Sequence, residues 1–155
     1  MRVFTVAALA ALTVAARPAA AQEPKAEVLT AVEDFMRGLK ARDLDLLNSR
    51  IDSTTRFTLV RPGPGGSRVI VLAGADFIRV ATRADQPAID EPIRNPVVQV
   101  DGDVATVWAE YQVRRDGKVS HCGHDAFHLA RVGGRWRIIN LIDSFQPQGC
   151  GDPWP

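Results

Sequence analysis

Alternating apolar and polar positions are clearest in the last third of the chain. Three stretches there are rich in β-branched and aromatic residues, and they cover residues 104–115, 118–132 and 135–145. The dipeptides Asp116-Gly117 and Gly133-Gly134 lie between them. Two-residue hairpin turns favour such dipeptides because the backbone φ there is positive. The pattern therefore predicts an antiparallel meander of three strands.

The first half of the chain is expected to be mainly helical. Apolar residues recur at helical spacing over 24–40, and Pro24 suits a first helical turn. Shorter helices are expected at 44–49, where Asp43 can act as the N-cap, and at 75–84. Two β-rich segments, 54–61 and 68–73, flank a loop of Pro and Gly at 62–67. A proline-punctuated extended segment at 87–96 precedes a further strand at 97–100.

The order of these segments indicates the fold class. Helices come first, a long meander follows, and there is no repeated strand–helix–strand alternation. Such an order is typical of an α+β domain, in which the helices pack on one face of an antiparallel sheet.

The first 21 residues have the layout of a secretory signal peptide. Arg2 precedes an apolar run over 3–16, and the alanines of 19–21 supply the small residues that a cleavage site needs. The run is too short to cross roughly 30 Å of hydrocarbon, and Arg17-Pro18 interrupts it. We therefore expect a periplasmic or secreted protein whose mature part, 22–155, is a single domain.

Charge and composition exclude some partners. The net charge of the whole chain is +1, and loss of the two leader arginines changes it to −1. A nucleic-acid partner calls for a concentrated basic face, whereas Lys and Arg are scattered here. We expect no nucleic-acid partner, no membrane-surface binding and no organic cofactor.

The two cysteines, Cys122 and Cys150, are expected to form a disulfide, because an even number of cysteines in an exported chain favours a bridge. The turn at Gly133-Gly134 places Cys122 opposite Phe145, so the chain must fold back after that strand to bring Cys150 close. Pro147 in the intervening segment is compatible with such a turn. Two unrelated thiols remain the alternative.

Three sequence features resemble a known family. They are the helix-rich start, the block Gly-Asp-Val-Ala-Thr-Val at 102–107, and His-Cys-Gly-His-Asp-Ala-Phe-His-Leu at 121–129 followed by Gly-Arg-Trp-Arg-Ile-Ile at 134–139. The pattern is similar to the nuclear transport factor 2-like superfamily, and within it to exported bacterial proteins of the SnoaL-like and lumazine-binding-like branch. The resemblance implies a cone-shaped domain, often dimeric, with a pocket between a curved sheet and three helices on its concave face.

Extending the register from the two turns gives a candidate site. It aligns Trp108, Asp125 and Ile142 in one row across the meander, and Phe127 with Asn140 in the next. This face carries most of the bulky apolar residues, so it is expected to face the helices and to bind a small apolar or aromatic ligand. A shift of one residue would exchange the two faces.

Asp125 is the candidate catalytic residue. A carboxylate on an apolar face is unfavourable unless it is hydrogen-bonded or keeps its proton, and such a group can serve as a base or acid near neutral pH. The resemblance implies that enzymes of the superfamily hold an Asp base or an Asp/His pair in the related pocket, acting on a carbonyl compound, and only the pocket carboxylate is carried over, to Asp125. Glu91 or Arg94 could join it from the proline-rich segment, whereas the register places Tyr111 on the other face. The alternative is an Asp with a purely structural role.

The histidines do not predict a metal site. His124 and His128 share a strand face but lie roughly 13 Å apart, and His121 would point the other way. One zinc ion needs ligands about 2 Å away, so the three cannot converge. His124 is instead expected opposite Asp143.

Three functions remain open from the sequence. The first is an exported small-molecule-binding domain without chemistry. The second is a small cofactor-independent enzyme of isomerase, dehydratase or cyclase type that uses Asp125 as general base. The third is a structural module that dimerises through its sheet. Only one titratable group can be placed in the pocket from the sequence, and this favours binding.

Overall fold

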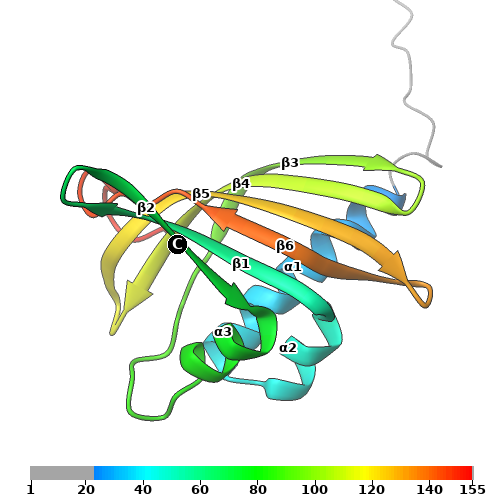
Figure 1. The fold of residues 1–155 in the computed structure, drawn as a ribbon, viewed down its shortest axis with the longest axis horizontal. Coiled ribbons are helices and arrows are strands. Elements are labelled where there is room, and N and C mark those ends of the chain that lie inside the picture. The colour runs from blue at the N-terminus through cyan, green and yellow to red at the C-terminus, as the bar shows by residue number, and fades with distance from the viewer. Residues whose placement is uncertain (1–22, 155) are drawn as a thin grey trace, which may run out of the picture.

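The computed structural model describes residues 23–154, so the predicted signal peptide lies outside the described residues. Three helices and six strands follow one another along the chain (Figure 1). They are α1 (Glu23–Ala41), α2 (Leu44–Arg50), β1 (Ile51–Gly63), β2 (Gly66–Ala73), α3 (Gly74–Ala81), β3 (Ile93–Asp101), β4 (Val104–Arg115), β5 (Lys118–Val132) and β6 (Arg135–Asp143). The predicted elements are present, and the expected α+β fold is confirmed.

The six strands form one curved sheet in the order β2-β1-β6-β5-β4-β3. All neighbours are antiparallel except β1 and β6, which are parallel. The sheet is thus mostly antiparallel, as expected, with one parallel pair. The two-strand unit β1–β2 joins the meander through β6, and this connection brings residues about 80 positions apart into contact.

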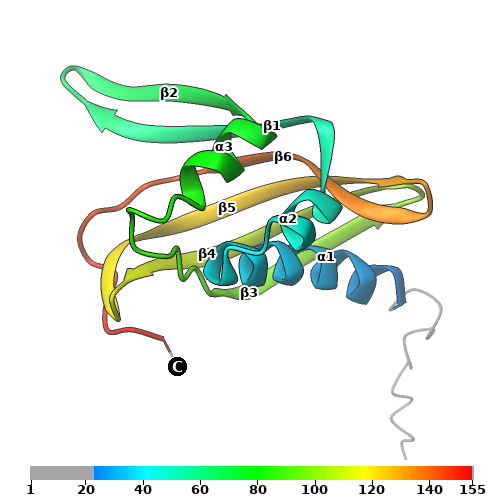
Figure 2. The ribbon, with the colours of Figure 1, turned by 90° about the horizontal axis from the view of Figure 1, so that it is seen from below.

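The helices cover one face of the sheet (Figure 2). The apolar stripe of α1 is buried against the sheet together with α2 and α3, as the amphipathic pattern predicts. Phe35 of α1 stacks on Phe57 of β1 at 5.6 Å between ring centroids, and Phe77 of α3 stacks on Phe57 at 4.3 Å. These three rings fasten the helices to the sheet at one end of the core.

The predicted register of the meander is wrong by one residue over most of its length. It holds beside the turns, where Arg115 pairs with Lys118 and Val132 with Arg135. A bulge then adds one residue near Ser120 of β5, and a second adds one near Ile139 of β6. A bulge places two residues opposite one and shifts all later pairs.

The shift separates residues that were expected in one row. Trp108 pairs with Ala126, and Ala126 pairs with Ile142, so this row lies on the face away from the helices. Asp125 pairs instead with Ala109 and Asp143, and this row is buried under the helices.

The predicted disulfide between Cys122 and Cys150 is confirmed, with their Cα atoms 5.6 Å apart. Cys122 lies opposite Gln146 rather than Phe145, because of the bulge in β6. The backbone of Cys122 and Gln146 exchanges two hydrogen bonds, of 3.0 and 2.8 Å. The segment after β6 thus runs back along β5 before it reaches Cys150. Within residues 23–154, no helix has the length and apolar character needed to span a membrane.

Candidate functional site

The helix-facing side of the sheet carries polar groups at one end of its buried row. Leu59, Ala109, Asp125 and Asp143 are cross-strand neighbours from β1, β4, β5 and β6. Cross-strand neighbours share a face, so both aspartates point toward the helices. A mainly apolar core layer therefore ends in two carboxyl groups.

These carboxyl groups open onto a cavity of about 190 Å³ between the sheet and the helices. One wall is apolar and comes mainly from α1, α3 and their neighbours: Phe35, Met36, Leu39, Leu59, Phe77, Ile89, Val113 and Leu141. The other wall is titratable: Arg61, Glu91, Arg115, His121, Asp125 and Asp143. The lining thus combines apolar side chains that can pack against a ring with titratable groups that can transfer a proton.

Asp125 is the most deeply buried carboxyl group of this wall. Its residue is 1% exposed, and neither carboxyl oxygen accepts a hydrogen bond from any donor among residues 23–154. An ionised carboxylate without donors in such a place is strongly disfavoured. Burial, followed by the charge of Glu91, raises the pKa of Asp125 well above its ordinary value. Asp125 is therefore expected to keep its proton at neutral pH.

Glu91 meets Asp125 from the segment between α3 and β3. Both groups line the cavity and each shifts the pKa of the other; because neither has a proton when ionised, only a shared proton can bridge them. Burial and the charge of Asp143 raise the pKa of Glu91 to about 7. Two carboxyl groups this close titrate as a pair, and the first proton lost leaves the second held more tightly.

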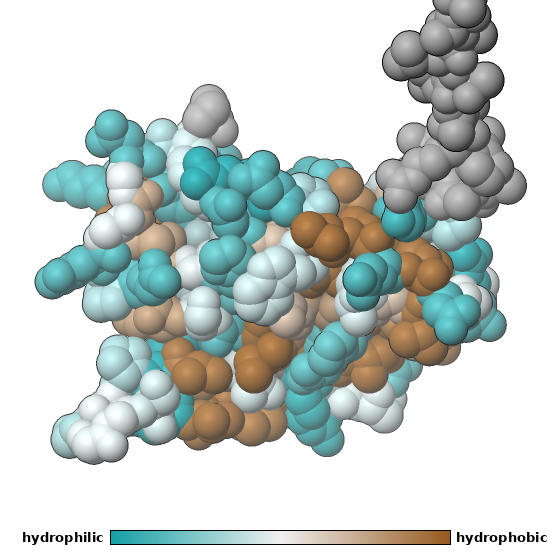
Figure 3. All heavy atoms as spheres, turned by 90° about the horizontal axis from the view of Figure 1, so that it is seen from above, coloured by the Kyte–Doolittle hydropathy of each residue, from teal (hydrophilic) through white to brown (hydrophobic). Residues whose placement is uncertain are grey.

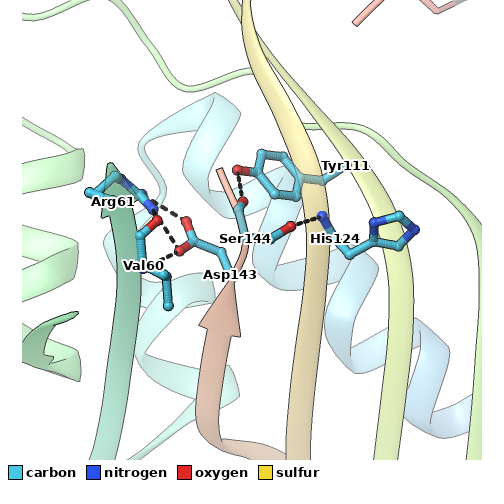
Figure 4. A network of polar contacts seen from close by, with 6 residues as sticks. All are labelled: Val60, Arg61, Tyr111, His124, Asp143 and Ser144. Atoms are coloured by element: carbon cyan, nitrogen blue, oxygen red, sulfur yellow. Dashed lines mark hydrogen bonds and ion pairs between the residues drawn. The ribbon is translucent and has the colours of Figure 1, made fainter. Parts of the chain in front are cut away.

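Asp143 differs from these two because it is tightly paired. Figure 4 shows its carboxylate between Arg61 and the backbone of Val60. Arg61 donates to both oxygens, at 2.6 and 2.7 Å, and Val60 N–H donates at 3.1 Å. A bidentate arginine–carboxylate contact is strong and fixes the orientation of the carboxylate. Arg61 and the Val60 N–H thus hold the Asp143 side chain in place next to Asp125.

His121 is a further residue of the cavity lining, and the Tyr111 ring lies edge-on beside it, 5.8 Å between ring centroids. Burial and then the charge of Arg61 lower the pKa of His121 to about 4, so its imidazole is neutral at pH 7. The Tyr111 hydroxyl donates to the backbone oxygen of Ser144 at 2.7 Å (Figure 4), and burial raises the pKa of Tyr111. The expectation that Tyr111 faces away from Asp125 is wrong, because the bulge in β5 places both on the same face.

The predicted ligand-binding residues divide between the two faces. Asp125 lines the cavity, and Phe127 is buried in the core on the same face. Trp108 and Ile142 lie on the opposite face, with exposed fractions of 51% and 38%. Asn140 is on that face as well, where its side chain contacts His128. The structure therefore does not bring these three into the cavity.

The histidines also lie differently from the prediction. His124 does not face Asp143; it pairs across the ladder with Glu110, and its ring stacks on Trp108 at 4.9 Å between centroids. His121 faces the cavity, while His124 and His128 face outward. Among the described residues, no three His, Cys, Asp or Glu side chains are arranged to hold a metal ion.

Sequence reasoning missed Arg61, His121 and Asp143 as cavity residues. Arg61 comes from β1, and only the parallel pairing of β1 with β6 brings it to Asp143. That long-range pairing has no local signal in the sequence. A signal did exist for the face of β4: its odd positions from Ala105 to Val113 are uniformly apolar apart from the Tyr111 hydroxyl.

Comparison with known proteins identifies the fold. No protein-family model matches the chain, and no curated protein matches it. Solved structures do match. A protein of unknown function from Mycobacterium tuberculosis has a TM-score of 0.68 at 17% identity, over 85% of this chain and 78% of that one.

Two further neighbours carry names that suggest an activity. A proposed dehydratase of the NTF2-like family from Streptomyces avermitilis has a TM-score of 0.64 at 16% identity, over 81% of this chain and 98% of that one. The beta subunit of a proposed aromatic-ring-hydroxylating dioxygenase from Novosphingobium aromaticivorans has a TM-score of 0.65 at 18% identity, over 82% and 92%. At such identities the likeness establishes the fold, which is nuclear transport factor 2-like, as the sequence blocks predicted.

Proposed function

We propose that this domain is a small cofactor-independent enzyme that moves a proton on a small cyclic carbonyl compound, as isomerases and dehydratases do. The observation that carries the proposal is the pair Asp125 and Glu91, two adjacent carboxyl groups that face a largely apolar cavity and have one proton to share. Structural ion pairs neutralise their charges with arginines, as Asp143 does. This pair instead keeps a reactive proton and a basic oxygen side by side.

The two carboxyl groups take different roles in this proposal. Asp125 is the more deeply buried group, so the shared proton resides mainly on it. Glu91, whose pKa lies about 7, supplies the basic oxygen. Glu91 takes the proton from the carbon next to the ligand carbonyl, the electron pair of that C–H bond moves to the carbonyl oxygen, and Asp125 protonates this oxygen. This assigns Asp125 the acid role rather than the expected base role.

The cavity limits the size and polarity of the ligand. Its volume of about 190 Å³ suits one ring with small substituents, since an apolar cavity of ~150 Å³ accepts benzene. The aromatic rings of Phe35 and Phe77 would pack against the ring of the ligand, and the carbonyl would point to Asp125. A compound with several fused rings would not fit without movement of α1 or α3.

Deuterium exchange tests this proposal with simple compounds, because proton exchange next to a carbonyl does not require the natural substrate. Cyclic ketones and enones of one ring are incubated with the protein in D₂O, and NMR measures deuterium incorporated next to the carbonyl. We expect Glu91→Gln to reduce exchange by about 10²-fold or more, because a general base contributes roughly 10²–10⁴. Asp125→Asn should reduce it less, since the amide still donates a hydrogen bond.

The control variant is Glu110→Gln, which removes a carboxylate that binds Arg94 and Asn95 on the outer face of the sheet. It should leave exchange unchanged. If compounds bind in the cavity but neither Glu91→Gln nor Asp125→Asn alters their exchange, the enzyme proposal fails. If the larger loss follows Asp125→Asn, Asp125 is the base.

A binding domain without chemistry is the second candidate, and the apolar wall of the cavity favours it. Under this alternative, a small aromatic compound binds and neither variant affects any reaction. The neighbour from an aromatic-ring-hydroxylating dioxygenase is described as a beta subunit, so the fold also occurs in a subunit of a larger enzyme.

Export and self-association are part of the same proposal. The disulfide supports an oxidising compartment, which agrees with the predicted signal peptide.

A homodimer is proposed through the outer face of the sheet, where Figure 3 shows apolar side chains gathered between polar ones. The row of Val97, Trp108 and Ile142 supports this, because its exposed fractions are 57%, 51% and 38%.

A further inference from the structure

The C-terminal segment 144–154 lies across the ends of β4 and β5, on the outer face of the sheet. The disulfide between Cys122 and Cys150 and the backbone pairing of Cys122 with Gln146 attach it to β5. A neighbouring side chain from β4, Gln112, attaches it further on. This segment is irregular, so these contacts rather than secondary structure determine its path.

Gln112 is fully buried, and the C-terminal segment satisfies its side-chain amide. The amide nitrogen donates to the backbone oxygens of Cys150 and Asp152, both at 3.1 Å, and the amide oxygen accepts from Trp154 N–H at 3.0 Å. A buried amide that makes three hydrogen bonds to one segment, two donated and one accepted, specifies where that segment must lie.

Arg114, also on β4, connects this segment to the residues before β3. Its guanidinium donates to the backbone oxygen of Trp154 and forms an ion pair with Asp90 at 2.9 Å. The backbone of Asp90 also pairs with Arg114, whose N–H donates to the Asp90 oxygen at 2.7 Å. Arg114 thus links the C-terminal segment to the residue immediately before Glu91.

A second contact holds the chain on the other side of Glu91, at Arg94. The guanidinium of Arg94 lies 4.1 Å from the ring centroid of Trp154, a cation–π contact. Successive side chains of an extended segment point to opposite sides, so Asp90 faces Arg114 while Glu91 faces the cavity. The C-terminal segment therefore holds the chain on both sides of Glu91 from the opposite face of the sheet.

We propose that the disulfide-anchored C-terminal segment positions Glu91 against Asp125, with Arg114 and Trp154 as positioning residues. This rests on the proposed function, since it concerns the geometry of the proposed acid–base pair. Phe145, at the start of the segment, contacts the lining residues His121 and Arg61, with its ring 4.6 Å from the His121 ring and 4.8 Å from the Arg61 guanidinium. The contacts of the segment with the residues beside Glu91 pass through Arg114 and Arg94. The effect of the segment on the pair is therefore indirect.

Carboxyl ¹³C NMR titration of Glu91 tests the proposal in the mature full-length chain. Three variants release the segment to different degrees: Cys122→Ser with Cys150→Ser, Arg114→Met, and Trp154→Ala. We expect the pKa of Glu91 to fall by about one unit or more in the first two, because Glu91 moves out toward water. Exchange of the Gln112 backbone amide proton, which is donated to the Pro92 oxygen at 3.2 Å, should become at least tenfold faster.

The matched control is Arg131→Met. Arg131 also joins a strand to other segments, pairing with Glu27 and Asp103 and lying over Trp136, but toward the other end of β5. It should leave the titration of Glu91 unchanged. If the cysteine variant is folded, its segment is released and Glu91 titrates as in the wild type, the positioning proposal is overturned.

The same data separate this proposal from the proposed function. A wild-type Glu91 and Asp125 that both titrate below about pH 5 would overturn the proton-sharing pair itself, and the positioning proposal with it. If the pKa values of Glu91 and Asp125 are raised in the wild type and equally raised in every variant, only the positioning role is overturned. The conservative variant Arg114→Lys, which keeps the charge and one donor group, should restore part of the shift lost in Arg114→Met.

Discussion

At the scale of single residues, hydrogen-bond partners distinguish two carboxyl groups of the cavity, those of Asp143 and Asp125. Asp143 has Arg61 and a backbone donor, whereas Asp125 has neither. Both are nearly buried, with exposed fractions of 8% and 1%. Burial therefore does not distinguish Asp125 from Asp143, whereas the lack of hydrogen-bond donors does. An ionised group is stabilised by donors, and a group without them keeps its proton.

The raised pKa of Glu91 has a consequence for stability. A carboxyl group whose pKa is higher in the folded state binds more protons there, so its contribution is complete below the ordinary value of 4.5 and is lost as the pH rises through about 7. The free energy of unfolding should therefore fall with pH in this window, by up to ~1.4 kcal/mol per pH unit for one extra proton.

Urea unfolding of the wild type and Glu91→Gln between pH 4.5 and 7 measures this effect. His121 acts in the opposite direction, because its lowered pKa makes the folded state less stable as the pH falls below 6.5. Its contribution is common to both proteins, so the difference between them isolates the carboxyl pair. A difference that is constant over the window would mean that Glu91 titrates normally.

At the scale of elements, two bulges decide which side chains reach the cavity. The turns at Asp116-Gly117 and Gly133-Gly134 were predictable, and so were the strands beside them. The bulges near Ser120 and Ile139 were not, because a single inserted residue leaves the β-propensity of the strand unchanged. The buried positions of β6 break the strict alternation between Ile138 and Leu141, and this break is visible only once burial is known.

Close packing of β5 against the end of β6 explains why position 123 is a glycine. A Cβ there would lie 2.3 Å from the backbone oxygen of Ser144 and 2.9 Å from the Tyr111 ring. Gly123→Ala should therefore destabilise the fold by about 2 kcal/mol, since overpacking forces backbone shifts.

Thermal and urea unfolding of Gly123→Ala beside Gly63→Ala checks this prediction. At Gly63 the nearest atom to an added Cβ is 3.3 Å away, so that variant should stay within about 1 kcal/mol of the wild type. Equal stability of the two variants would contradict the close approach of β6 to Gly123.

At the scale of the whole molecule, the fold was predictable from the sequence and the site only in part. The segregation of helices and strands, the closing Gly-Arg-Trp-Arg-Ile-Ile block and the cysteine pair identified the architecture. Asp125 was identified because it interrupts an apolar strand face. Arg61 and Asp143 could not be placed, since the pairing of β1 with β6 joins segments about 80 residues apart and follows from packing of the complete sheet.

The proposed dimer is a prediction at this scale. Sedimentation of the mature protein should show a dimer, and Trp108→Glu should convert it to a monomer, because a charge at the centre of an apolar interface is not compensated. Val69→Glu is the matched control, since Val69 is 63% exposed on the edge strand β2. A wild type that is monomeric at high concentration would contradict the dimer.

Carboxyl ¹³C NMR titration of Asp125 and Glu91 in the unliganded, disulfide-bonded wild type is the most direct test of the central claim, that they share a proton in the cavity. The account predicts that Asp125 stays protonated at pH 6 and that Glu91 titrates near pH 7. In Asp125→Asn, the pKa of Glu91 should stay raised, because burial and the charge of Asp143 raise it, whereas the hydrogen bond with Asp125 lowers it. If both carboxyl groups of the wild type are ionised by pH 5, the cavity holds no shared proton and the proposed chemistry is excluded.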